Sequence, residues 1–409
     1  MSDNNGGFQR RYRIILLFSL YLSQGLPFGY QATALPVYLR GKGVSLTLIG
    51  FSTILAAPWF LKVFWAPFID TIWSRKIGRR RSWIIPLQTM LFLSIFSASF
   101  TSSAGIKFLI INIFIMNFLA ASQDIAVDGL AVDILGEHEL GYGNAAQVIG
   151  YKAGMIISGG LLVWLTGFYE WKTLFSVMAA ISLLPLVLVF FYNETGSAGK
   201  CLNRVTLSDV WNILVKSAGS NTFRWLIFFI AFYKFGEIMI DVMYKPFLVD
   251  SGIAASDIGL WVGTWGMGAS IAGSAAGGFI ASKLSVYRAV FAACILRLFP
   301  LIYVSVLTFI TPSAYHVITA TLLEHFFGGL LTTTLFAFMM FNSDRSIGAT
   351  HYTLLAAVEV IGKTPGALFS GFMTERAGYS LCFITGTLIS LAVIFILPFY
   401  NKSLKREQL

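Results

Sequence analysis

Long apolar runs recur along the whole chain, and short polar segments separate them. A membrane-spanning helix needs about 20 mostly apolar residues. Twelve runs have this character: 14–38, 47–69, 82–103, 106–134, 144–168, 171–192, 223–249, 257–282, 288–309, 316–341, 351–372 and 380–400. In lipid the backbone must satisfy its own hydrogen bonds, so such runs form helices. The sequence therefore predicts an all-α, polytopic membrane protein with twelve transmembrane helices in two six-helix bundles.

The composition supports this fold class and excludes a soluble globule. Only 12% of the 409 residues are charged, whereas soluble domains carry about 25% charged residues. The net charge of +10 does not predict nucleic-acid binding, because most of the basic residues lie between the apolar runs and not on one soluble patch. We expect the lipid bilayer as the main partner, no nucleic acid, and a monomer or weak homodimer.

Sequence patterns of enzymes are missing. The chain has no phosphate-binding loop, no zinc-hydrolase motif and no nucleophilic serine motif. Its cysteines, Cys201, Cys294 and Cys382, do not have the spacing of metal ligands. We therefore predict no enzyme, no cofactor and no metal site. A membrane acyltransferase is the weaker alternative.

Basic residues are distributed unevenly between the two sets of loops. Eighteen lie near the termini or in loops that follow even-numbered runs, and six lie in the remaining loops. Because Lys and Arg concentrate on the cytoplasmic side of membrane proteins, we predict that both termini are cytoplasmic. The host membrane stays open between the endoplasmic reticulum, the plasma membrane and the bacterial inner membrane.

The longest polar segment divides the runs into two sets of six. We predict an N-terminal bundle at 1–192, a cytoplasmic linker at 193–222 with an amphipathic helix near 207–218, and a C-terminal bundle at 223–409. A short internal repeat supports two fused halves. It pairs Pro36, Leu39, Gly43, Ile49 and Gly50 with Pro246, Val249, Gly252, Ile258 and Gly259.

The loop after the second run starts at Asp70 and continues through Gly78 to Arg79, Arg80 and Arg81. It resembles the signature loop of the major facilitator superfamily, although Ala66-Pro67 stands where that family usually has a glycine. The resemblance implies a gate, in which the acidic and basic side chains lock the cytoplasmic side shut. Simple anchoring at the membrane surface is the alternative, but anchoring needs neither the carboxylate nor the glycine.

The fourth run contains two carboxylates, Asp124 and Asp128, and the amide of Gln123. The carboxylates are four residues apart, so they share one helix face. Carboxylates within a membrane are costly unless they face a partner or a water-filled cavity. Neighbouring carboxylates also resist ionising together, which favours a proton-coupling site. The alternative is a buried ion pair that only positions helices.

Partners for these carboxylates lie in neighbouring runs. Gln147, Tyr151 and Lys152 lie on adjacent faces of the fifth run, and Lys62 lies at a similar depth in the second. Lys152 is expected to pair with one of the two carboxylates or to bind an anion directly. For both lysines the alternative is a side chain that extends along the helix to the membrane surface.

The seventh run carries two possible helix-neighbour ion pairs, Lys234–Glu237 and Asp241–Lys245. Such pairs favour a structural role for part of this set, but Lys234 lies near the middle of the membrane and is expected to face a cavity. Arg297 lies similarly deep in the ninth run. An arginine there either fixes a helix by pairing or contacts the solute.

The tenth and eleventh runs add further ionisable residues. Glu324 and His325 are adjacent, and His titrates near neutral pH. We consider a proton-coupling role for Glu324 and a solute contact for His325, with simple packing of the histidine as the alternative. Glu359 and Lys363 have the spacing of an intrahelical salt bridge.

Two runs have features that suit movement. Gln24-Gly25-Leu26-Pro27 is expected to loosen the first run near its middle. Freed carbonyls there are tolerated where the helix lines a cavity. Glycines give the eighth run a face for close helix packing: Gly266, Gly268, Gly273, Gly277 and Gly278.

Taken together, these motifs resemble the branch of the major facilitator superfamily that contains acetyl-coenzyme A transporters and the bacterial muropeptide permease AmpG. The match is carried by Gln24-Gly25-Leu26-Pro27, Lys62 with Trp65-Ala66-Pro67, Gly78-Arg79-Arg80-Arg81-Ser82-Trp83 and Gln123-Asp124-Ile125-Ala126-Val127-Asp128. The resemblance implies a midplane cavity and alternating access. It also implies acetyl-coenzyme A as one cargo and sugar-peptide fragments, imported with protons, as another.

We therefore expect a secondary transporter of a bulky, polar, anionic solute, with a coenzyme A-type, nucleotide-type or acylated metabolite favoured. A proton-coupled muropeptide permease is the alternative, and a receptor or scaffold without transport is the rival class. Expected solute contacts are Gln24, Lys62, Gln123, Gln147, Tyr151, Lys152, Lys234, Arg297 and His325. Protons or a counter-substrate would be coupled through Asp124, Asp128, Glu237 and Glu324.

Overall fold

The computed structural model describes residues 2–35, 39, 52–162, 169–192, 194, 205–253 and 255–407. These described residues are largely helical, and the one β-type pairing among them is an isolated bridge between Ser74 and Gly78. The chain forms two compact units. Unit 1 contains Met1–Gly136, Ala146–Val210 and Ser343–Thr353, and unit 2 contains Glu137–Ala145, Trp211–Asn342 and Leu354–Leu409. The predicted bundles at 1–192 and 223–409 remain a proposal.

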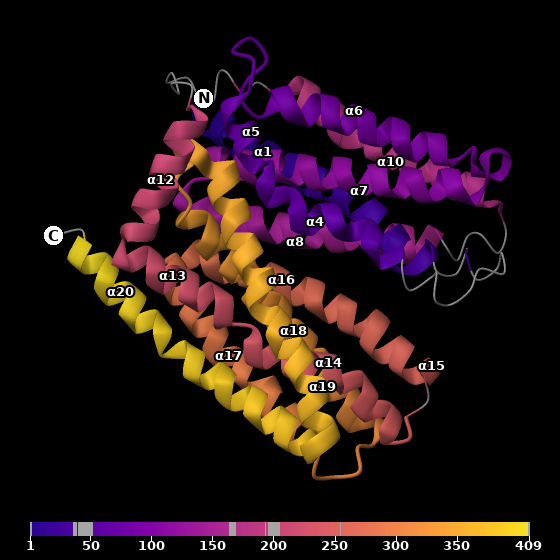
Figure 1. The fold of residues 1–409 in the computed structure, drawn as a ribbon, viewed down its shortest axis with the longest axis vertical. Coiled ribbons are helices and arrows are strands. Elements are labelled where there is room, and N and C mark those ends of the chain that lie inside the picture. Colours follow the sequence, from indigo (N-terminus) through magenta and orange to yellow (C-terminus); the bar gives the residue numbers. More distant parts are fainter. Residues whose placement is uncertain are drawn as a thin grey trace. The chain divides into compact units, whose positions relative to one another are not determined.

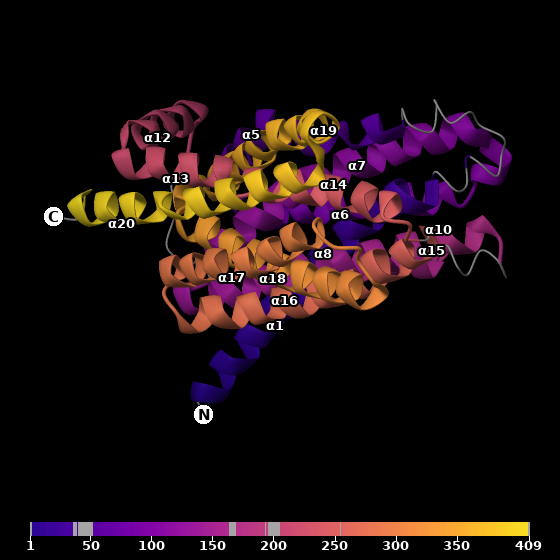
Figure 2. The same cartoon turned by 90° about the horizontal axis from the view of Figure 1, so that it is seen from below.

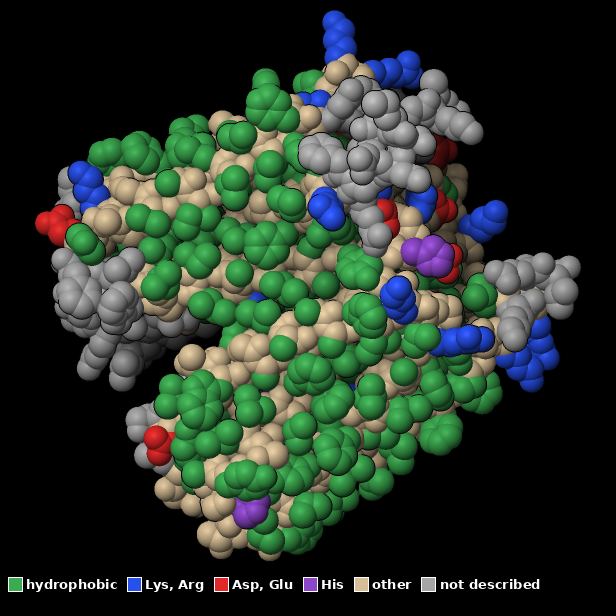
Figure 3. Space-filling model, turned by 180° about the vertical axis from the view of Figure 1, so that it is seen from behind, with side chains coloured by type: hydrophobic (Ala, Val, Ile, Leu, Met, Phe, Trp, Pro, Cys, Tyr) green, Lys and Arg blue, Asp and Glu red, His purple; other side chains and the backbone are tan. Residues whose placement is uncertain are grey.

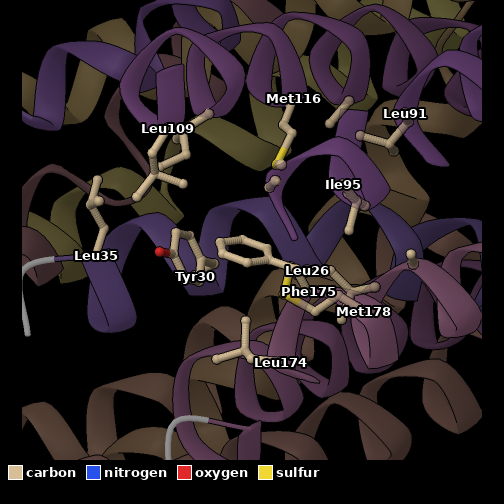
Figure 4. Packing of buried hydrophobic residues seen from close by; sticks show 14 of the residues in the cluster. Leu26, Tyr30, Leu35, Leu91, Ile95, Leu109, Met116, Leu174, Phe175 and Met178 are labelled. Atoms are coloured by element: carbon tan, nitrogen blue, oxygen red, sulfur yellow. The ribbon is translucent and has the colours of Figure 1, made fainter. Parts of the chain in front are cut away.

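Unit 1 is built around α1, α6, α7 and α10, which pack side by side (Figure 1). Its elements are α1 (Ser2–Gly29), η1 (Tyr30–Ala34), η2 (Ser52–Ala56), α4 (Ala57–Leu61), η3 (Lys62–Phe64), α5 (Ala66–Thr71), α6 (Arg81–Ala98), α7 (Thr101–Ile134), η5 (Ile157–Leu161), α10 (Trp171–Phe191) and η7 (Arg345–Ile347). α8 (Leu140–Ile156) begins in unit 2 and continues into unit 1. Tyr30 and Phe175 lie at the centre of the apolar core of unit 1 (Figure 4), with their ring centroids 4.9 Å apart.

Unit 2 is built around α16, α17 and α18, which lie side by side (Figure 2). Its described elements are η4 (Glu137–Glu139), α13 (Asn221–Phe232), α14 (Phe235–Asp250), α15 (Ala255–Ile258), η6 (Gly259–Trp265), α16 (Gly266–Lys283), α17 (Val286–Leu307), α18 (Ala314–Phe341) and α20 (Ile396–Glu407). Two helices cross the unit boundary: α12 (Leu207–Gly219) and α19 (Gly348–Ile394). α12 confirms the amphipathic helix that the linker sequence predicts.

The predicted membrane runs fall mainly on helical residues wherever the structure describes them. Five described stretches are long and apolar enough to cross a membrane: Gly105–Ile134, Trp171–Phe191, Val286–Leu307, Ala314–Phe341 and Arg345–Leu404. The last stretch joins the eleventh and twelfth runs, because α19 continues through a bend at Gly378. Apolar side chains cover most of the face in Figure 3, and charged side chains gather near its edges.

Several predicted runs are broken rather than continuous helices. In the second run, Pro58 and Pro67 stand at the starts of α4 and α5, where their missing N–H groups cost little. Lys62 therefore lies in the short turn between these helices. Lys234 lies in the corresponding kind of break between α13 and α14. In the first run the helix widens into the π-helical turn η1 three residues after Pro27, as the prediction of a loosened helix requires.

Glycines allow close helix packing at two places. A Cβ atom on Gly25 of α1 would lie 2.2 Å from the carbonyl oxygen of Tyr151 in α8. A Cβ atom on Gly273 of α16 would lie 1.8 Å from the carbonyl oxygen of Phe326 in α18. Backbones this close exclude any larger side chain. The predicted glycine face of the eighth run is thus confirmed at Gly273, whereas a Cβ on Gly268 would meet nothing within 4 Å. Four of the five N-terminal repeat positions lie outside the described residues.

Candidate functional site

The carboxylates of α7 form the centre of a polar cluster inside unit 1. Asp124 forms an ion pair with Lys62. Asp128 accepts a hydrogen bond of 2.6 Å from the hydroxyl of Tyr21 and one of 3.4 Å from the amide of Gln147. Both carboxylates are at least nine-tenths buried. Asp124 is thus paired with a charged ammonium, whereas Asp128 is hydrogen-bonded to neutral donors. The two carboxylates therefore have different electrostatic environments although they share one helix face.

The glutamines around this cluster are buried and incompletely paired. Gln123 donates to Gln88, which donates in turn to Ser23 at 2.9 Å. Gln24 is fully buried, yet neither its oxygen nor its nitrogen has a hydrogen-bond partner among the described residues. The side-chain oxygens of Gln123 and Gln147 also have no partner there. Leaving one such group unpaired costs about 1–3 kcal/mol, so water or a ligand is expected at these atoms.

The remaining predicted contacts of unit 1 lie nearby on α8. Tyr151 is half-buried, and its ring lies 6.0 Å from the rings of Phe28 and Trp59. Lys152 is also half-buried, and its pairing with Asp124 or Asp128 stays a prediction. The lysine that pairs with Asp124 in the structure is Lys62. Residue spacing in the sequence did not predict this pair.

The loop predicted to form the gate surrounds the buried carboxylate of Asp70. That carboxylate accepts hydrogen bonds from Arg79 at 2.7 Å and Arg80 at 2.8 Å. Its other oxygen accepts from the backbone N–H and the hydroxyl of Thr350, both at 2.7 Å. Thr350 belongs to the segment 343–353, which is part of unit 1 although it lies 280 residues further along the chain.

The charge of Asp70 is insensitive to pH near neutrality. Burial by itself would raise the pKa of Asp70, but Arg80, Arg79 and the hydrogen bonds from Thr350 lower it below the ordinary value. A carboxyl group with a lowered pKa stabilises the fold above its unfolded-state pKa of about 3.9. That contribution is lost only as the pH falls through the still lower folded-state value. Asp70 is therefore charged at neutral pH and suits a fixed ionic contact.

Two further acids hold the gate loop, and the sequence did not identify either. Glu194 is 5% exposed and accepts hydrogen bonds from the backbone N–H groups of Arg80 and Arg81 at 2.9 and 3.0 Å. Its carboxylate thus caps the N-terminus of α6, where the helix dipole favours negative charge. Asp133 accepts from the Nε of Arg80 at 2.7 Å. Arg81 also donates to the carbonyl of Phe190 at 3.0 Å.

Replacing Gly78 by alanine should loosen the gate loop. Gly78 has a φ of +110°, and a Cβ atom there would lie 2.4 Å from a carboxylate oxygen of Glu194. We expect strain of about 1–3 kcal/mol from the backbone conformation, in addition to displacement of the helix cap. Labelling of a cysteine introduced at Ser346 should become faster in Gly78→Ala, while Gly219→Ala, which meets nothing within 4 Å, should label as the parent does. Equal labelling rates in the two variants would contradict a gating role for this turn.

In unit 2 a single guanidinium lies among three carboxylates. Arg297 forms ion pairs with Glu237 at 3.1 Å, with Asp241 at 3.8 Å and with Glu324. Ligand atoms of these carboxylates lie within 4.8 Å of one another, which is a spacing that metal sites share. Because Arg297 already contacts all three, the guanidinium provides the positive charge, and the residues do not fit a metal ion. The predicted pairing of Asp241 with Lys245 is not the contact that Asp241 makes.

The other ionisable side chains of unit 2 adjoin this cluster. The Nζ of Lys234 lies 3.9 Å from the Oε1 of Glu237. The Nδ1 of His325 lies 2.6 Å from the Oε2 of Glu324. The predicted intrahelical salt bridge between Glu359 and Lys363 is confirmed at 2.9 Å. The predicted solute contacts Lys234, Arg297 and His325 thus each lie within ion-pair distance of a carboxylate.

A small cavity lies beside Arg297. Its volume is about 10 Å³, and its lining includes Tyr233, Glu237, Arg297 and Ser390. The Nε of Arg297 and the hydroxyl of Ser390 are buried without a hydrogen-bond partner among the described residues. A space of this size holds at most one water molecule. It is therefore too small to be the binding site of a bulky solute.

Comparisons with known proteins agree on one fold and one group of relatives. A family model described as acetyl-coenzyme A transporter 1 matches residues 13–167. The anhydromuropeptide permease of Escherichia coli is 26% identical over 405 residues, covering 97% of this chain and 81% of the permease. An uncharacterized protein of Haemophilus influenzae is 30% identical over 387 residues, covering 90% of this chain and 89% of that protein.

Solved structures extend the comparison to the fold. The major facilitator superfamily transporter FucP in the outward conformation has a TM-score of 0.70 at 13% identity, covering 95% of this chain and 98% of FucP. The human organic anion transporter MFSD10 (TETRAN) has a TM-score of 0.68 at 15% identity, covering 95% of this chain and 99% of MFSD10. At these identities the likeness shows an all-α membrane protein with the fold of that superfamily, without indicating the solute.

Proposed function

Because this chain belongs to the AmpG and acetyl-coenzyme A transporter family of the major facilitator superfamily, we propose that it moves an anionic solute together with protons. Family membership makes the protein a secondary transporter of a small molecule and not an enzyme. We further propose twelve transmembrane helices in two bundles and cytoplasmic termini. The Lys62–Asp124 ion pair is the observation that carries the proposed coupling.

The ion pair makes anion binding depend on a proton. In the paired state the ammonium of Lys62 is neutralised by Asp124, so a solute anion meets a carboxylate of its own sign. Protonation of Asp124 removes that charge and releases Lys62 for a charge-assisted hydrogen bond to the anion. Asp128, held by Tyr21 and Gln147, keeps its place on the same helix face during this exchange. We favour symport over exchange with a counter-substrate, because the solute anion binds Lys62 while the proton is bound to Asp124.

The unit 2 cluster supports the same principle. Glu237, Asp241 and Glu324 share Arg297, so this arginine also meets a solute anion only after a carboxylate gains a proton or moves away. The imidazole of His325 lies against the carboxylate of Glu324. We propose that Arg297 fixes the three acids and that Glu237 and Glu324 take part in coupling.

The gate gives alternating access a structural basis. Asp70 binds Thr350 of the segment 343–353, and Arg79 donates to the carbonyls of Arg345 and Ser346 there. Arg80 donates to Asp70. We propose that these bonds form when the cytoplasmic side is closed and break when it opens. Gly78 and Arg81, through Glu194, keep the loop in the shape that presents these side chains.

For the solute we favour a bulky acylated anion of the coenzyme A or nucleotide type, with a muropeptide as the alternative. The description of the matching family model supports the first, and the name of the Escherichia coli relative supports the second. Within the family, Tyr151-Lys152-Ala153-Gly154 and Tyr233-Lys234-Phe235-Gly236-Glu237 resemble the animal group called major facilitator superfamily domain-containing protein 3. We propose that the chain belongs to that subgroup.

Transport in proteoliposomes tests this proposal. A thermal-shift screen of acetyl-coenzyme A, nucleotides, acyl carnitines and anhydromuropeptides should select an anion, whose labelled form should then exchange across the membrane. We expect Lys62→Gln to reduce flux about 100-fold or more, since a charge-assisted contact and its partner are lost. Lys216→Gln, on the amphipathic helix α12, is the matched control. Binding without any flux or counterflow would instead identify a receptor on the same fold.

A further inference from the structure

We propose that the side chains of Phe28, Trp59 and Tyr151 form a ring-binding subsite beside Lys62, so that the solute carries a ring next to its anionic group. This inference rests on the proposed anion site at Lys62 and adds a second recognition element to it. The subsite selects among anions by shape, which the ion pair alone does not do.

Three elements far apart in sequence bring the rings together. Phe28 belongs to α1, Trp59 to α4 and Tyr151 to α8. Their centroids lie 6.4 Å apart for Phe28 and Trp59, and 6.0 Å apart for each of the other two pairs. All three residues are half-buried. Each residue therefore keeps some accessible surface after packing on its two neighbours.

The indole of Trp59 is fixed in direction by buried hydrogen bonds. Its Nε1 donates to the side-chain oxygen of Asn117 at 3.0 Å, and Asn117 donates to Gln31 at 2.7 Å. Asn117 is fully buried and Gln31 is 6% exposed. Polar side chains within a membrane are costly and usually serve a function or join helices. The hydrogen bonds from Trp59 to Asn117 and from Asn117 to Gln31 fix the orientation of the indole. It provides a ring face that is already in place before a solute arrives.

Gln24 supplies a second and independent indication of a ligand. It lies three residues after Tyr21 and four before Phe28, so all three share one face of α1. Tyr21 reaches Asp128, and Phe28 reaches Trp59 and Tyr151, so Gln24 lies between the carboxylate cluster and the rings. Its fully buried amide has no partner for oxygen or nitrogen among the described residues. An amide can pair with the polar edge of a ring whose face packs on an aromatic side chain.

The ammonium group of Lys62 lies close to the ring of Trp59. The Nζ of Lys62 lies 5.5 Å from the centroid of Trp59, while Lys62 also pairs with Asp124. An anionic group on Lys62 would thus bring an attached ring to the face of Trp59. Two ring chemistries suit such a platform: a heteroaromatic base, which stacks, and a pyranose, which packs its C–H face on an indole.

Binding to the purified chain in detergent tests the subsite with four probes: inorganic pyrophosphate, ribose 5-phosphate, adenosine 5′-diphosphate and N-acetylglucosamine 1-phosphate. In the parent protein we expect one of the two larger ring-bearing probes to bind at least about tenfold more tightly than pyrophosphate. Trp59→Leu should remove that advantage and leave pyrophosphate affinity within about twofold. Tyr151→Leu gives the same readout if Trp59→Leu does not fold. Which probe loses affinity identifies the base or the sugar as the source of the ring.

The matched control is Trp65→Leu, because Trp65 donates to Ser122 and packs on Phe118 outside the ring group. Its ring advantage should equal that of the parent. Equal affinities for all four probes, or equal losses in Trp59→Leu and Trp65→Leu, would overturn the subsite. If pyrophosphate still binds and Lys62→Gln removes it, the anion site stands and only the ring subsite fails. If no probe binds, both fail.

Discussion

Replacing Asp124 by asparagine should abolish proton-driven accumulation of solute while leaving solute exchange intact. Asparagine has nearly the same shape as a protonated aspartic acid but has no carboxylate charge, so Lys62 stays available to the anion at every pH. Accumulation should fall to the equilibrium level, a loss of about 100-fold under a gradient of two pH units. Exchange of labelled for unlabelled solute should continue, because it needs no change in protonation.

Uptake and counterflow in the same proteoliposome preparation measure this split. Glu137→Gln is the matched control, since this exposed carboxylate lies in η4, beyond the end of α7, and takes no part in the ion pair. It should retain both activities. Full accumulation in Asp124→Asn, or equal loss of accumulation and exchange, would contradict coupling through this pair.

Replacing Arg297 by methionine should strongly destabilise the protein. The substitution would leave Glu237, Asp241 and Glu324 close together without the guanidinium that all three contact. Arg297 is 2% exposed, and breaking a buried pair by removing one partner costs about 3–5 kcal/mol. The thermal midpoint of the purified variant in detergent should therefore drop well below that of the parent, before any effect on transport is considered.

A double variant separates this structural role from solute contact. Adding Glu324→Gln to Arg297→Met removes one uncompensated charge, so it should recover part of the lost stability. Arg376→Met, at an exposed arginine that lies over the ring of Phe372, is the control and should melt near the parent temperature. An unchanged thermal midpoint in Arg297→Met would show that the cluster is not held together by this arginine.

The helical fold was predictable because membrane helices are set by local composition. A run of about 20 apolar residues predicts a helix wherever its partners lie. Local rules also predicted the salt bridge of Glu359 with Lys363 and a loosened first run, since each depends on neighbours within about one turn. The loosening lies slightly later than expected, at Tyr30–Ala34. The glycine packing at Gly273 followed in the same way from the small-residue pattern.

Contacts between distant helices were not predictable from spacing. Lys62 is 62 residues from Asp124, and helix periodicity gives no preference for it over Lys152. Thr350 is 280 residues from Asp70, and Glu194 belongs to a segment that reads as a polar linker. Asp241 was assigned to Lys245 because the two are one turn apart, whereas the buried guanidinium of Arg297 is the stronger attraction across the helix interface.

In the proposed mechanism, an anion gains Lys62 only when Asp124 takes up a proton. The most direct measurement is the number of protons taken up when the anion selected by the thermal-shift screen binds, obtained by calorimetry near neutral pH in buffers of different ionisation enthalpy. We predict uptake of about one proton per solute in the parent protein and none in Asp124→Asn. Binding of the solute with no proton uptake in the parent, or with the same uptake in both proteins, would contradict it.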